Sequence, residues 1–483
     1  MSSMAIEQRP NIVFVLLDTV RADYLGLYGG SLRLKNLDAI ARKGTVYEHA
    51  IAPGTYTAPS HASLFLGKRA ARIKAFTADP MKNYDSNIDP MVEHVKYISK
   101  KDITLAAKLR YMGYETALFS NNPFISKNTG LADGFEYIDN IWLDTKVLNS
   151  KGITRFALNL IANKQARNSL INLAYALTFL MRKQRVDRLY ISLKRALDKH
   201  FAKQYGFYKL DSGASKTNKK IAKYLDTKST DRCKFLFVNY MEGHEGYPTN
   251  LITNEFIDQE KWLYMAGLSN EENVKIISEA YKKRLAYLDS KLAELMQILK
   301  QKGVLDNAVV VFASDHGQAF MEHGLMYHNM FPFNELVHVP LVVAKYVNGK
   351  QVNTKERVEK KVSITALHNS ILEIGRGMAD DIDGKLRKDN FVFSDHVGIT
   401  EVWDTHLLEL LRRRSVNADK IYRIKKQVNT FATAVYYKEF KLIIYKNKRL
   451  ELYNLKEDPE ERDNIIGKNR SIAIEMLDAS KAM

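Results

Sequence analysis

Residues Asn11 to Asp18 read NIVFVLLD, and this stretch decides the fold class. Its near-continuous apolar run is typical of a strand that is buried on both faces of a parallel sheet. Two later runs have the same character, FLFVNY at Phe235–Tyr240 and AVVVFA at Ala308–Ala313. Together with the helical stretches between them, they predict an α/β protein with a large, mostly parallel sheet flanked by helices.

Polar side chains follow the three apolar runs, at the edge where an open α/β sheet binds its ligands. Asp18 ends the first run, and His244 follows the second run in a glycine-broken loop. Asp315 and His316 follow the third run. An Asp beside a His is a suitable pair of ligands for one divalent cation. Each residue alone has an ordinary alternative, since Asp18 could cap the next turn and a lone histidine usually has no function.

Residues 57 to 67, TAPSHASLFLG, predict a helix whose start suits an anion. Pro59 fits the first turn of a helix, and Thr57 lies just ahead of it. The first turn offers unpaired backbone N–H groups and the positive end of the helix dipole. A Thr57 hydroxyl with a lowered pKa could attack a phosphorus or sulfur atom bound there. The alternative is an ordinary helix that is capped by Thr57 or Ser60.

These pieces together predict a metal centre with a nucleophile. The candidate ligands of one divalent cation are Asp18, Thr57, Asp315 and His316. The cation would lower the pKa of the threonine hydroxyl and create a nucleophile at neutral pH. His244 and His328 would stabilise charge on the oxygens of the transferring group. Asn121 and Asn122, which follow a predicted strand at residues 115–120, could line the pocket, although we favour a simple turn there; of the two, we count Asn121 among the substrate contacts.

The composition is that of a globular protein and excludes two kinds of site. Of the 483 residues, 46% are hydrophobic and 27% are charged, so disorder of the whole chain is not expected. The single cysteine, Cys233, excludes an internal disulfide and a cysteine-based metal cluster, and it fits a reducing compartment. The first residues show no secretory signal, and no run of 18 apolar residues exists. We therefore expect a cytoplasmic protein, with peripheral membrane contact as an alternative.

Most of the excess positive charge lies in one segment. The formal net charge is +18, and residues 151 to 232 contain 19 Lys and Arg against 5 Asp, a net of +14. Apolar residues at nearly helical spacing predict a basic helical insertion at about 151–222. We favour a helical hairpin with a solvated basic face, and the alternative is a surface that contacts anionic membrane lipid. No nucleic-acid motif accompanies the charge, so no specific nucleic acid is expected.

The last hundred residues differ in pattern from the rest. Phe431–Tyr437, Lys441–Tyr445 and Glu451–Asn454 predict short strands of an antiparallel sheet. We therefore predict a catalytic α/β domain over residues 8–400, which carries the insertion, and a small C-terminal α+β subdomain over residues 401–483. The sequence leaves the oligomeric state open.

Six stretches, in the right order, resemble the sulfatase family within the alkaline phosphatase superfamily. They read PNIVFVLLDTVRADYLGLYG, TAPSHASLFLGKR, NYMEGHEGYP, SDHGQAFMEHGLMYH, HVPLVV and ELYNLKEDPEERDNI. The resemblance runs over most of the chain and leaves out only the basic insertion. The resemblance implies an alkaline-phosphatase-like fold with a smaller C-terminal domain built on an antiparallel sheet. It places Thr57 at the nucleophile position. It also implies that His244 and His328 contact the oxygens of the bound ester. The implied metal ligands are Asp18, Asp315 and His316.

Three positions depart from the sulfatase pattern. Thr57 stands where true sulfatases carry a Cys or Ser that is converted to formylglycine, and a threonine cannot be so converted. His61 replaces the usual arginine, and we count it among the residues that contact the substrate. Thr19 stands where many sulfatases have a second aspartate, which predicts a leaner metal site suited to Mn or Zn more than to Mg or Ca.

We therefore predict a metal-dependent hydrolase of the sulfatase family with Thr57 as its nucleophile. A formylglycine hydrate expels sulfate by re-forming its aldehyde, whereas a threonine sulfate ester has no such exit. Water can resolve a phosphothreonine, so we favour phosphate esters or phosphonates over sulfate esters. The substrate would be a small anionic ester, a glycan or a lipid. The alternatives are a transferase that moves a phospho-head-group onto a lipid or glycan at a membrane surface, and a non-catalytic protein that binds anions.

Overall fold

The structure is a computed structural model of the chain. It describes residues 9–77, 96–99, 101–140, 210–227, 231–245, 267, 271–328, 330–353, 355–379, 382, 386, 389–398 and 415–482. Most of the predicted basic insertion therefore lies outside the described residues, and the membrane contact predicted for it stays a prediction. No helix in the described ranges is both long and apolar enough to cross a membrane.

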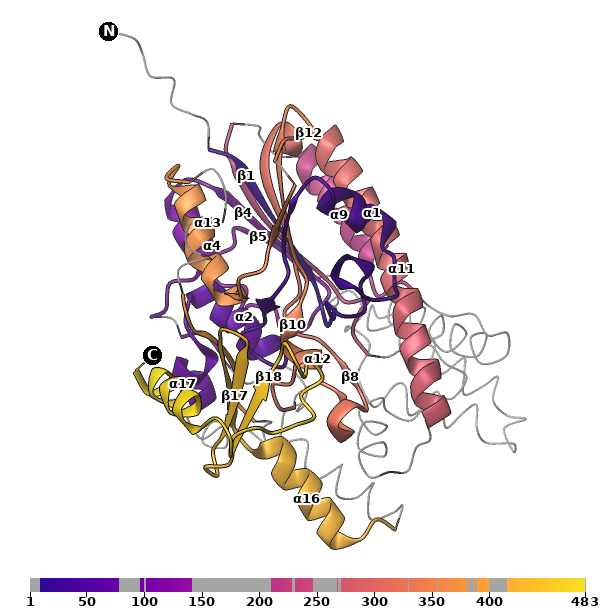
Figure 1. The fold of residues 1–483 in the computed structure, drawn as a ribbon. Helices are drawn as coiled ribbons and strands as arrows, with labels where there is room; N and C mark the ends of the chain where they lie inside the picture. Colours follow the sequence, from indigo (N-terminus) through magenta and orange to yellow (C-terminus); the bar gives the residue numbers. More distant parts are fainter. Residues whose placement is uncertain are drawn as a thin grey trace, which may run out of the picture.

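A nine-stranded sheet forms the centre of the fold (Figure 1). Its order is β13-β2-β11-β7-β1-β6-β4-β5, with β12 paired to β11. The strands from β7 to β5 run parallel, whereas β11 is antiparallel to β7 and β2. The strands are β1 (Asn11–Leu17), β2 (Thr45–Tyr47), β4 (Glu115–Ser120), β5 (Tyr137–Asn140), β6 (Lys234–Tyr240), β7 (Asn307–Ala313), β11 (Leu341–Val347), β12 (Lys350–Gln351) and β13 (Glu356–Val358). The predicted large, mostly parallel sheet is confirmed.

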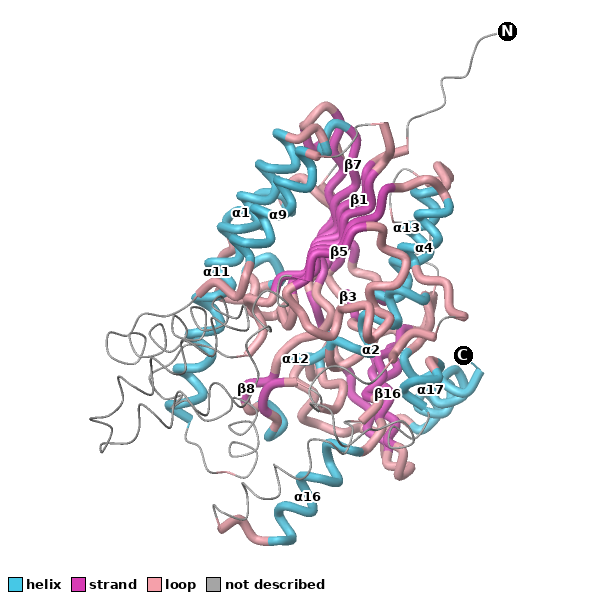
Figure 2. Tube along the Cα trace, turned by 180° about the vertical axis from the view of Figure 1, so that it is seen from behind, coloured by secondary structure: helices cyan, strands magenta, loops and turns pink. Residues whose placement is uncertain are grey.

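Helices cover both faces of this sheet, which explains the continuous apolar sequence of β1. Phe14 packs into the hydrophobic core on one face, and Val15 packs into the core on the other. The helices on the Phe14 face are α2 (Thr57–Leu66), α4 (Leu105–Tyr111) and α13 (Leu367–Gly375). Those on the Val15 face are α1 (Lys35–Ala41), α9 (Ala214–Asp226) and α11 (Glu271–Gln301). Figures 1 and 2 show the two helical layers on opposite sides of the sheet.

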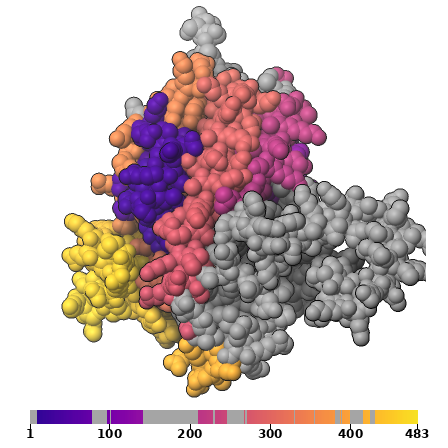
Figure 3. Space-filling view, turned by 90° about the vertical axis from the view of Figure 1, so that its right-hand side faces the viewer, coloured from indigo at the N-terminus to yellow at the C-terminus, as the bar shows by residue number. Residues whose placement is uncertain are grey.

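The long helix α11 lies against α1 on the surface of the molecule, where Figure 3 shows the two side by side in salmon and indigo. Asp289 of α11 fixes this contact, because its two carboxylate oxygens accept the backbone N–H groups of Leu37 (2.9 Å) and Asn36 (3.0 Å). Apolar residues at helical spacing in the sequence predict this helix as Asn273–Lys302, within two residues of its observed bounds.

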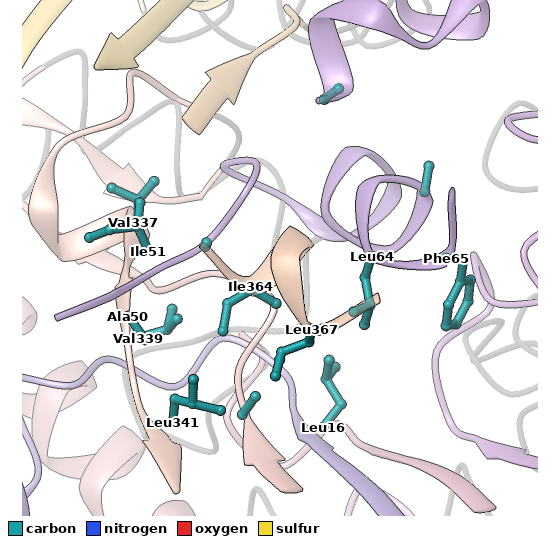
Figure 4. Close-up of a cluster of buried hydrophobic side chains, with 14 of the residues drawn as sticks. Leu16, Ala50, Ile51, Leu64, Phe65, Val337, Val339, Leu341, Ile364 and Leu367 are labelled. Carbon is teal, nitrogen blue, oxygen red and sulfur yellow. The ribbon is translucent and has the colours of Figure 1, made fainter. Parts of the chain in front are cut away.

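Helix α2, which begins at Thr57, is fully enclosed by the protein, since all ten of its residues are buried. Figure 4 shows Leu64 and Phe65 of α2 with Leu16, Ile364 and Leu367 in a hydrophobic cluster. Nearby small sheets consist of β3 (Ala50–Ile51), β10 (His338–Val339) and β14 (Val362–Ser363), and of β8 (Ala319–Phe320) with β9 (Met326–Tyr327). The remaining short helices are Gly26–Tyr28, Ala70–Arg72, α3 (Lys74–Thr77), Val304–Asp306, Glu322–Gly324, α12 (Asn334–Val337) and Ile364–Ala366.

The C-terminal part contains the antiparallel sheet expected from the sequence. Its four strands, in spatial order, are β15 (Val392–His396), β16 (Ala432–Tyr437), β17 (Phe440–Tyr445) and β18 (Leu450–Asn454). The terminal helix α17 (Arg470–Ala482) packs against this sheet through Ala473 and Met476. Helix α16 (Ala418–Asn429) lies between β15 and β16 in the chain. Strand β15 lies ahead of the predicted domain boundary at residue 400, and the division into two domains stays a prediction.

Strand β15 holds both ends of α2. Before the helix, Asp395 N donates to Pro53 O over 2.9 Å, and His396 Nδ1 lies 3.0 Å from Thr55 Oγ1. After the helix, Arg69 Nη2 donates to one carboxylate oxygen of Asp395 (2.9 Å), and Ala71 N donates to the other (3.1 Å). The C-terminal sheet therefore contributes to the position of α2.

Candidate active site

Adjacent strand ends bring the predicted metal ligands together. Strand β1 pairs with β7 on one side, so Asp18 and the Asp315–His316 pair follow neighbouring strands. On the other side, Asp18 N donates to Tyr240 O over 2.9 Å. One donor atom from each of Asp18, Asp315 and His316 lies within 4.8 Å of the other two, and all three side chains are buried. The structure thus assembles the predicted group at the carboxyl edge of the sheet.

The facing atoms of this group fit a divalent cation. His316 Nδ1 donates to Gly317 O over 2.9 Å, so the lone pair of the neutral ring is on Nε2. His316 Nε2 lies 3.4 Å from Asp315 Oδ2 and 4.0 Å from Asp18 Oδ1. Among the described residues, neither of these buried carboxylate oxygens has a hydrogen-bond partner. Electron-rich atoms that face one another in a buried site are unfavourable unless a cation or a proton lies between them.

Thr57 directs its hydroxyl at the same group. Its Oγ1 lies 3.5 Å from His316 Nε2 and accepts a hydrogen bond of 3.2 Å from Asn122 Nδ2. Helix α2 begins at Thr57, and its capping position is Tyr56, whose backbone is extended. Thr57 therefore does not cap the helix, and its hydroxyl faces the predicted metal ligands at the helix start.

Backbone N–H groups orient the Asp315 carboxylate, and a side-chain amide orients that of Asp18. Asp315 Oδ1 accepts from Thr19 N (3.3 Å) and His316 N (3.0 Å), while Asp18 Oδ2 accepts from Asn122 Nδ2 (2.8 Å). Thr19 has a φ of 58°, a left-handed conformation that is strained for a β-branched residue. Its hydroxyl donates to Asp18 O over 2.7 Å. Position 19 therefore supplies a backbone donor to Asp315, and its side chain bonds to the backbone.

Glu245, which the sequence analysis missed, connects the two predicted histidines. Its Oε2 lies 3.3 Å from His244 Nδ1 and 3.1 Å from His328 Nδ1. Gln318 contacts the same pair, because its Oε1 is 3.0 Å from His328 Nδ1 and its Nε2 donates to Glu245 Oε2 over 3.3 Å. The rings of His328 and His316 are 4.8 Å apart, so this cluster adjoins the metal group. The position of Glu245 directly after His244 in a glycine-broken loop is the sequence signal that could have identified it as a site residue.

Two other predicted contact residues lie differently. Of the two predicted asparagines, Asn121 faces α9, where its Nδ2 donates to Thr217 Oγ1 over 3.2 Å, whereas Asn122 donates to Thr57 Oγ1 at the site. His61 is 1% exposed and donates from Nδ1 to Thr57 O over 2.9 Å. It therefore supports the start of α2 from inside the protein, and its contact with a substrate stays a prediction.

Comparison with known proteins identifies the family. The sequence model of the Sulfatase family matches residues 10–377. The chain belongs to the sulfatase family. As a member of this family it is a hydrolase of sulfuric or phosphoric esters.

Relatives of this sulfatase-family protein support the same fold. The N-acetylglucosamine-6-O-sulfatase of Bacteroides thetaiotaomicron is 22% identical over 506 residues, which span 95% of this chain and 83% of the relative. The phosphonate monoester hydrolase of Agrobacterium radiobacter has a TM-score of 0.59 at 15% identity, covering 98% of this chain and 95% of that one. A structure solved with its substrate D-glucosamine-2-N,6-O-disulfate has a TM-score of 0.58 at 14% identity, covering 98% and 97%. These likenesses confirm the alkaline-phosphatase-like fold.

Burial dominates the electrostatics of the two aspartates. Burial and the neighbouring Asp315 raise the pKa of Asp18 to about 6. Burial raises the pKa of Asp315 to about 7, although backbone N–H groups partly offset this effect. The pair therefore retains protons at a pH where ordinary carboxyl groups have lost them.

The histidines of this sulfatase-family site differ in charge. Burial lowers the pKa of His316, that of His328 to about 4 and that of His61 to about 3, so these rings are neutral at pH 7. Burial also acts to lower the pKa of His244, but Glu245 and Asp18 outweigh it and raise that pKa. His244 is therefore the ring on which the site favours positive charge.

We expect stabilisation by a divalent cation to increase from about pH 5 to about pH 8. The folded pKa values of Asp18 and Asp315 lie above the ordinary 3.8, so their protons stabilise the cation-free protein at low pH. That stabilisation is lost as the pH rises through about 6 to 7, and a cation no longer competes with protons there. Calorimetry with and without Mn²⁺ should give the larger increase in Tm at about pH 8. An equal increase at both pH values would contradict this assignment of the carboxylates.

Proposed function

We propose that this sulfatase-family protein hydrolyses phosphate esters or phosphonates with Thr57 as its nucleophile. The observation that supports this most is the position of Thr57 Oγ1, which lies 3.5 Å from His316 Nε2 at the buried carboxylate pair. A divalent cation held by Asp18, Asp315 and His316 would lower the pKa of the adjacent hydroxyl. The mixed shell of carboxylate oxygen and imidazole nitrogen leads us to favour Mn²⁺ or Zn²⁺.

The side chains around Thr57 suit an in-line displacement. Asn122 Nδ2 orients Oγ1, and the backbone N–H groups in the first turn of α2 would face an anion bound there. The Thr57 hydroxyl would lose its proton to water, and its oxygen would form a bond to phosphorus while the bond to the leaving oxygen breaks. His244 and His328 would meet the remaining ester oxygens. Since the His328 ring is neutral at pH 7, water is the better source of the proton for the leaving oxygen.

The fate of the covalent intermediate favours phosphorus over sulfur. Water can attack the phosphorus of a phosphothreonine, which breaks the Thr57–phosphorus bond and restores the hydroxyl. A formylglycine hydrate can release sulfate by re-forming its aldehyde, whereas a threonine sulfate ester cannot release sulfate in this way. We propose a small anionic ester, on a sugar or a lipid, as the substrate. The names of the N-acetylglucosamine-6-O-sulfatase and of the disulfated glucosamine bound to a similar fold support a sugar carrier.

Hydrolysis of aryl phosphate, aryl phosphodiester, aryl phosphonate and aryl sulfate by the metal-loaded protein tests the proposal. We expect phosphorus esters to be the better substrates and Thr57→Ala to lower their turnover by at least about 1,000-fold. Thr57→Ser, which keeps a hydroxyl, should retain much more of the turnover. Ser63→Ala removes a buried hydroxyl from the same helix and serves as the control. Sulfate turnover that survives in Thr57→Ala would show that another residue is the nucleophile.

A further inference from the structure

The loop of residues 241–245, which follows β6 and carries His244, lies directly against the end of β1. A Cβ at Gly243 would lie 2.4 Å from the carbonyl oxygen of Asp18, so only glycine allows this close approach. His244 N donates to Met241 O over 3.1 Å, which closes the loop into a turn. A quarter of the His244 side chain is exposed, so a substrate that enters beside Asp18 can reach its ring.

Arg284 holds the backbone of this loop from inside the protein. It belongs to α11 and is only 3% exposed. Its Nη1 donates to His244 O over 3.3 Å, and its Nη2 donates to Met241 O over 3.4 Å. Nη2 also donates to Ser212 Oγ, which fixes the guanidinium in turn. A planar guanidinium can serve two carbonyl groups at once, whereas the ammonium of a lysine is a single point of charge.

Glu245 holds the ring of the same histidine. Its carboxylate Oε2 and its backbone carbonyl oxygen lie 3.3 Å and 3.4 Å from His244 Nδ1, and both oxygens are acceptors. Nδ1 therefore carries a proton, and the ring directs Nε2 away from Glu245.

The carboxylate of Glu245 is itself fixed and charged. His328 Nδ1 and Gln318 Nε2 lie 3.1 Å and 3.3 Å from the same Oε2 atom. Burial acts to raise the pKa of Glu245, but His244 and His328 outweigh it and lower that pKa, so the carboxylate stays ionised. A charged acceptor that is held by two other side chains can keep the His244 ring in one orientation.

We propose that Arg284 and Glu245 are positioning residues for His244, one through its backbone and the other through its ring. Together they place the Nε2 atom of His244 where it meets an oxygen of the bound ester. This inference rests on the proposed function, in which His244 meets the ester oxygens. Neither positioning residue needs to touch the substrate. Because each acts through His244, its effect on turnover depends on the presence of that ring.

A double-mutant cycle on the full, metal-loaded chain tests this dependence. Arg284→Lys and Glu245→Gln should each lower turnover of the best ester substrate by about 100-fold, as expected when a reacting group is misplaced by about 1 Å. In a His244→Ala background, each should lower the remaining turnover by less than about 2-fold. Losses of equal size in both backgrounds, or no loss in the wild-type background, would overturn the proposal. If Arg284→Lys does not fold, the cycle with Glu245→Gln decides alone.

Two matched controls separate positioning from a general effect of the substitutions. Arg232 also donates to two backbone carbonyls, those of Gly113 (3.1 Å) and Tyr114 (2.7 Å), but it lies at the opposite end of the strands. Arg232→Lys should leave turnover unchanged. Glu279→Gln on the exposed surface of α11 makes the same chemical change as Glu245→Gln and should also leave turnover unchanged.

Binding of inorganic phosphate gives a measurement that does not depend on turnover. Loss of one hydrogen bond to a charged group weakens binding by about 10-fold, and calorimetry should show this loss in Arg284→Lys and in Glu245→Gln. Unchanged phosphate affinity in both variants would overturn the inference, whichever residue attacks the ester. Failure of the positioning residues is thus distinguishable from failure of Thr57 as the nucleophile.

Discussion

Asp315→Asn is expected to abolish binding of the cation that we propose at Asp18, Asp315 and His316, and to lower ester turnover by at least about 1,000-fold. The variant keeps the size of the side chain but loses the charge that faces His316 Nε2 and Asp18 Oδ1. A transition state that loses about 4 kcal/mol of electrostatic stabilisation forms about 1,000 times more slowly. Metal content and turnover of phosphorus esters, measured on the same preparation, check both parts of the expectation.

Asp289→Asn provides a matched control for that variant. Asp289 is also a buried aspartate that accepts two backbone N–H groups, but it lies on α11 at the contact with α1. Its replacement should lower the Tm and leave the metal content unchanged. If Asp315→Asn kept full activity and full metal content, the site that we assign at the strand ends would be wrong.

Lys441→Met is expected to lower the free energy of unfolding by about 3–5 kcal/mol. Lys441 on β17 is fully buried, and its Nζ lies 2.5 Å from Glu461 Oε1. Glu461 also accepts the backbone N–H of Asn334 at the start of α12 over 2.6 Å. The pair thus joins the C-terminal sheet to the body of the protein, and the variant leaves the Glu461 charge buried without its partner. Urea unfolding measures the loss.

The double variant and the pH dependence test the cause of this loss. Lys441→Met with Glu461→Gln should be more stable than Lys441→Met alone, because no unpaired charge remains. Burial raises the pKa of Glu461, so the carboxyl of the single variant should take up a proton and recover stability as the pH falls. Lys448→Met on the exposed turn after β17 is the control. Equal losses in the single and double variants would exclude an unpaired charge as the cause.

The sequence predicted the central strands and the grouping of Asp18, Asp315 and His316 because both depend on local pattern and strand order. A strand with helices on both faces, such as β1, needs apolar residues at every position, and that signature is visible without a structure. Parallel strands end at one edge, so Asp18 and Asp315 had to approach each other once their strands were neighbours. The long helix α11 was equally clear from its periodicity.

Other features depend on side-chain direction, which the sequence pattern did not give. Asn121 and Asn122 are chemically equal, and only the path of the chain after β4 decides that Asn122 meets Thr57. In the sequence, Glu245 is indistinguishable from an ordinary loop carboxylate, because its partners Gln318 and His328 are distant in the chain and meet it only in the fold. The left-handed backbone of Thr19 likewise has no sequence signature, because threonine rarely adopts it.

The contacts of β15 with both ends of α2 have a consequence for protein engineering. A chimera that takes residues after 391 from another member of the family would exchange the strand that carries Asp395 and His396. The donor strand would have to supply a carboxylate for Arg69 and Ala71 and a partner for Thr55, or α2 would lose its support at both ends. The C-terminal sheet is therefore not an interchangeable module, although none of the predicted catalytic residues belongs to it.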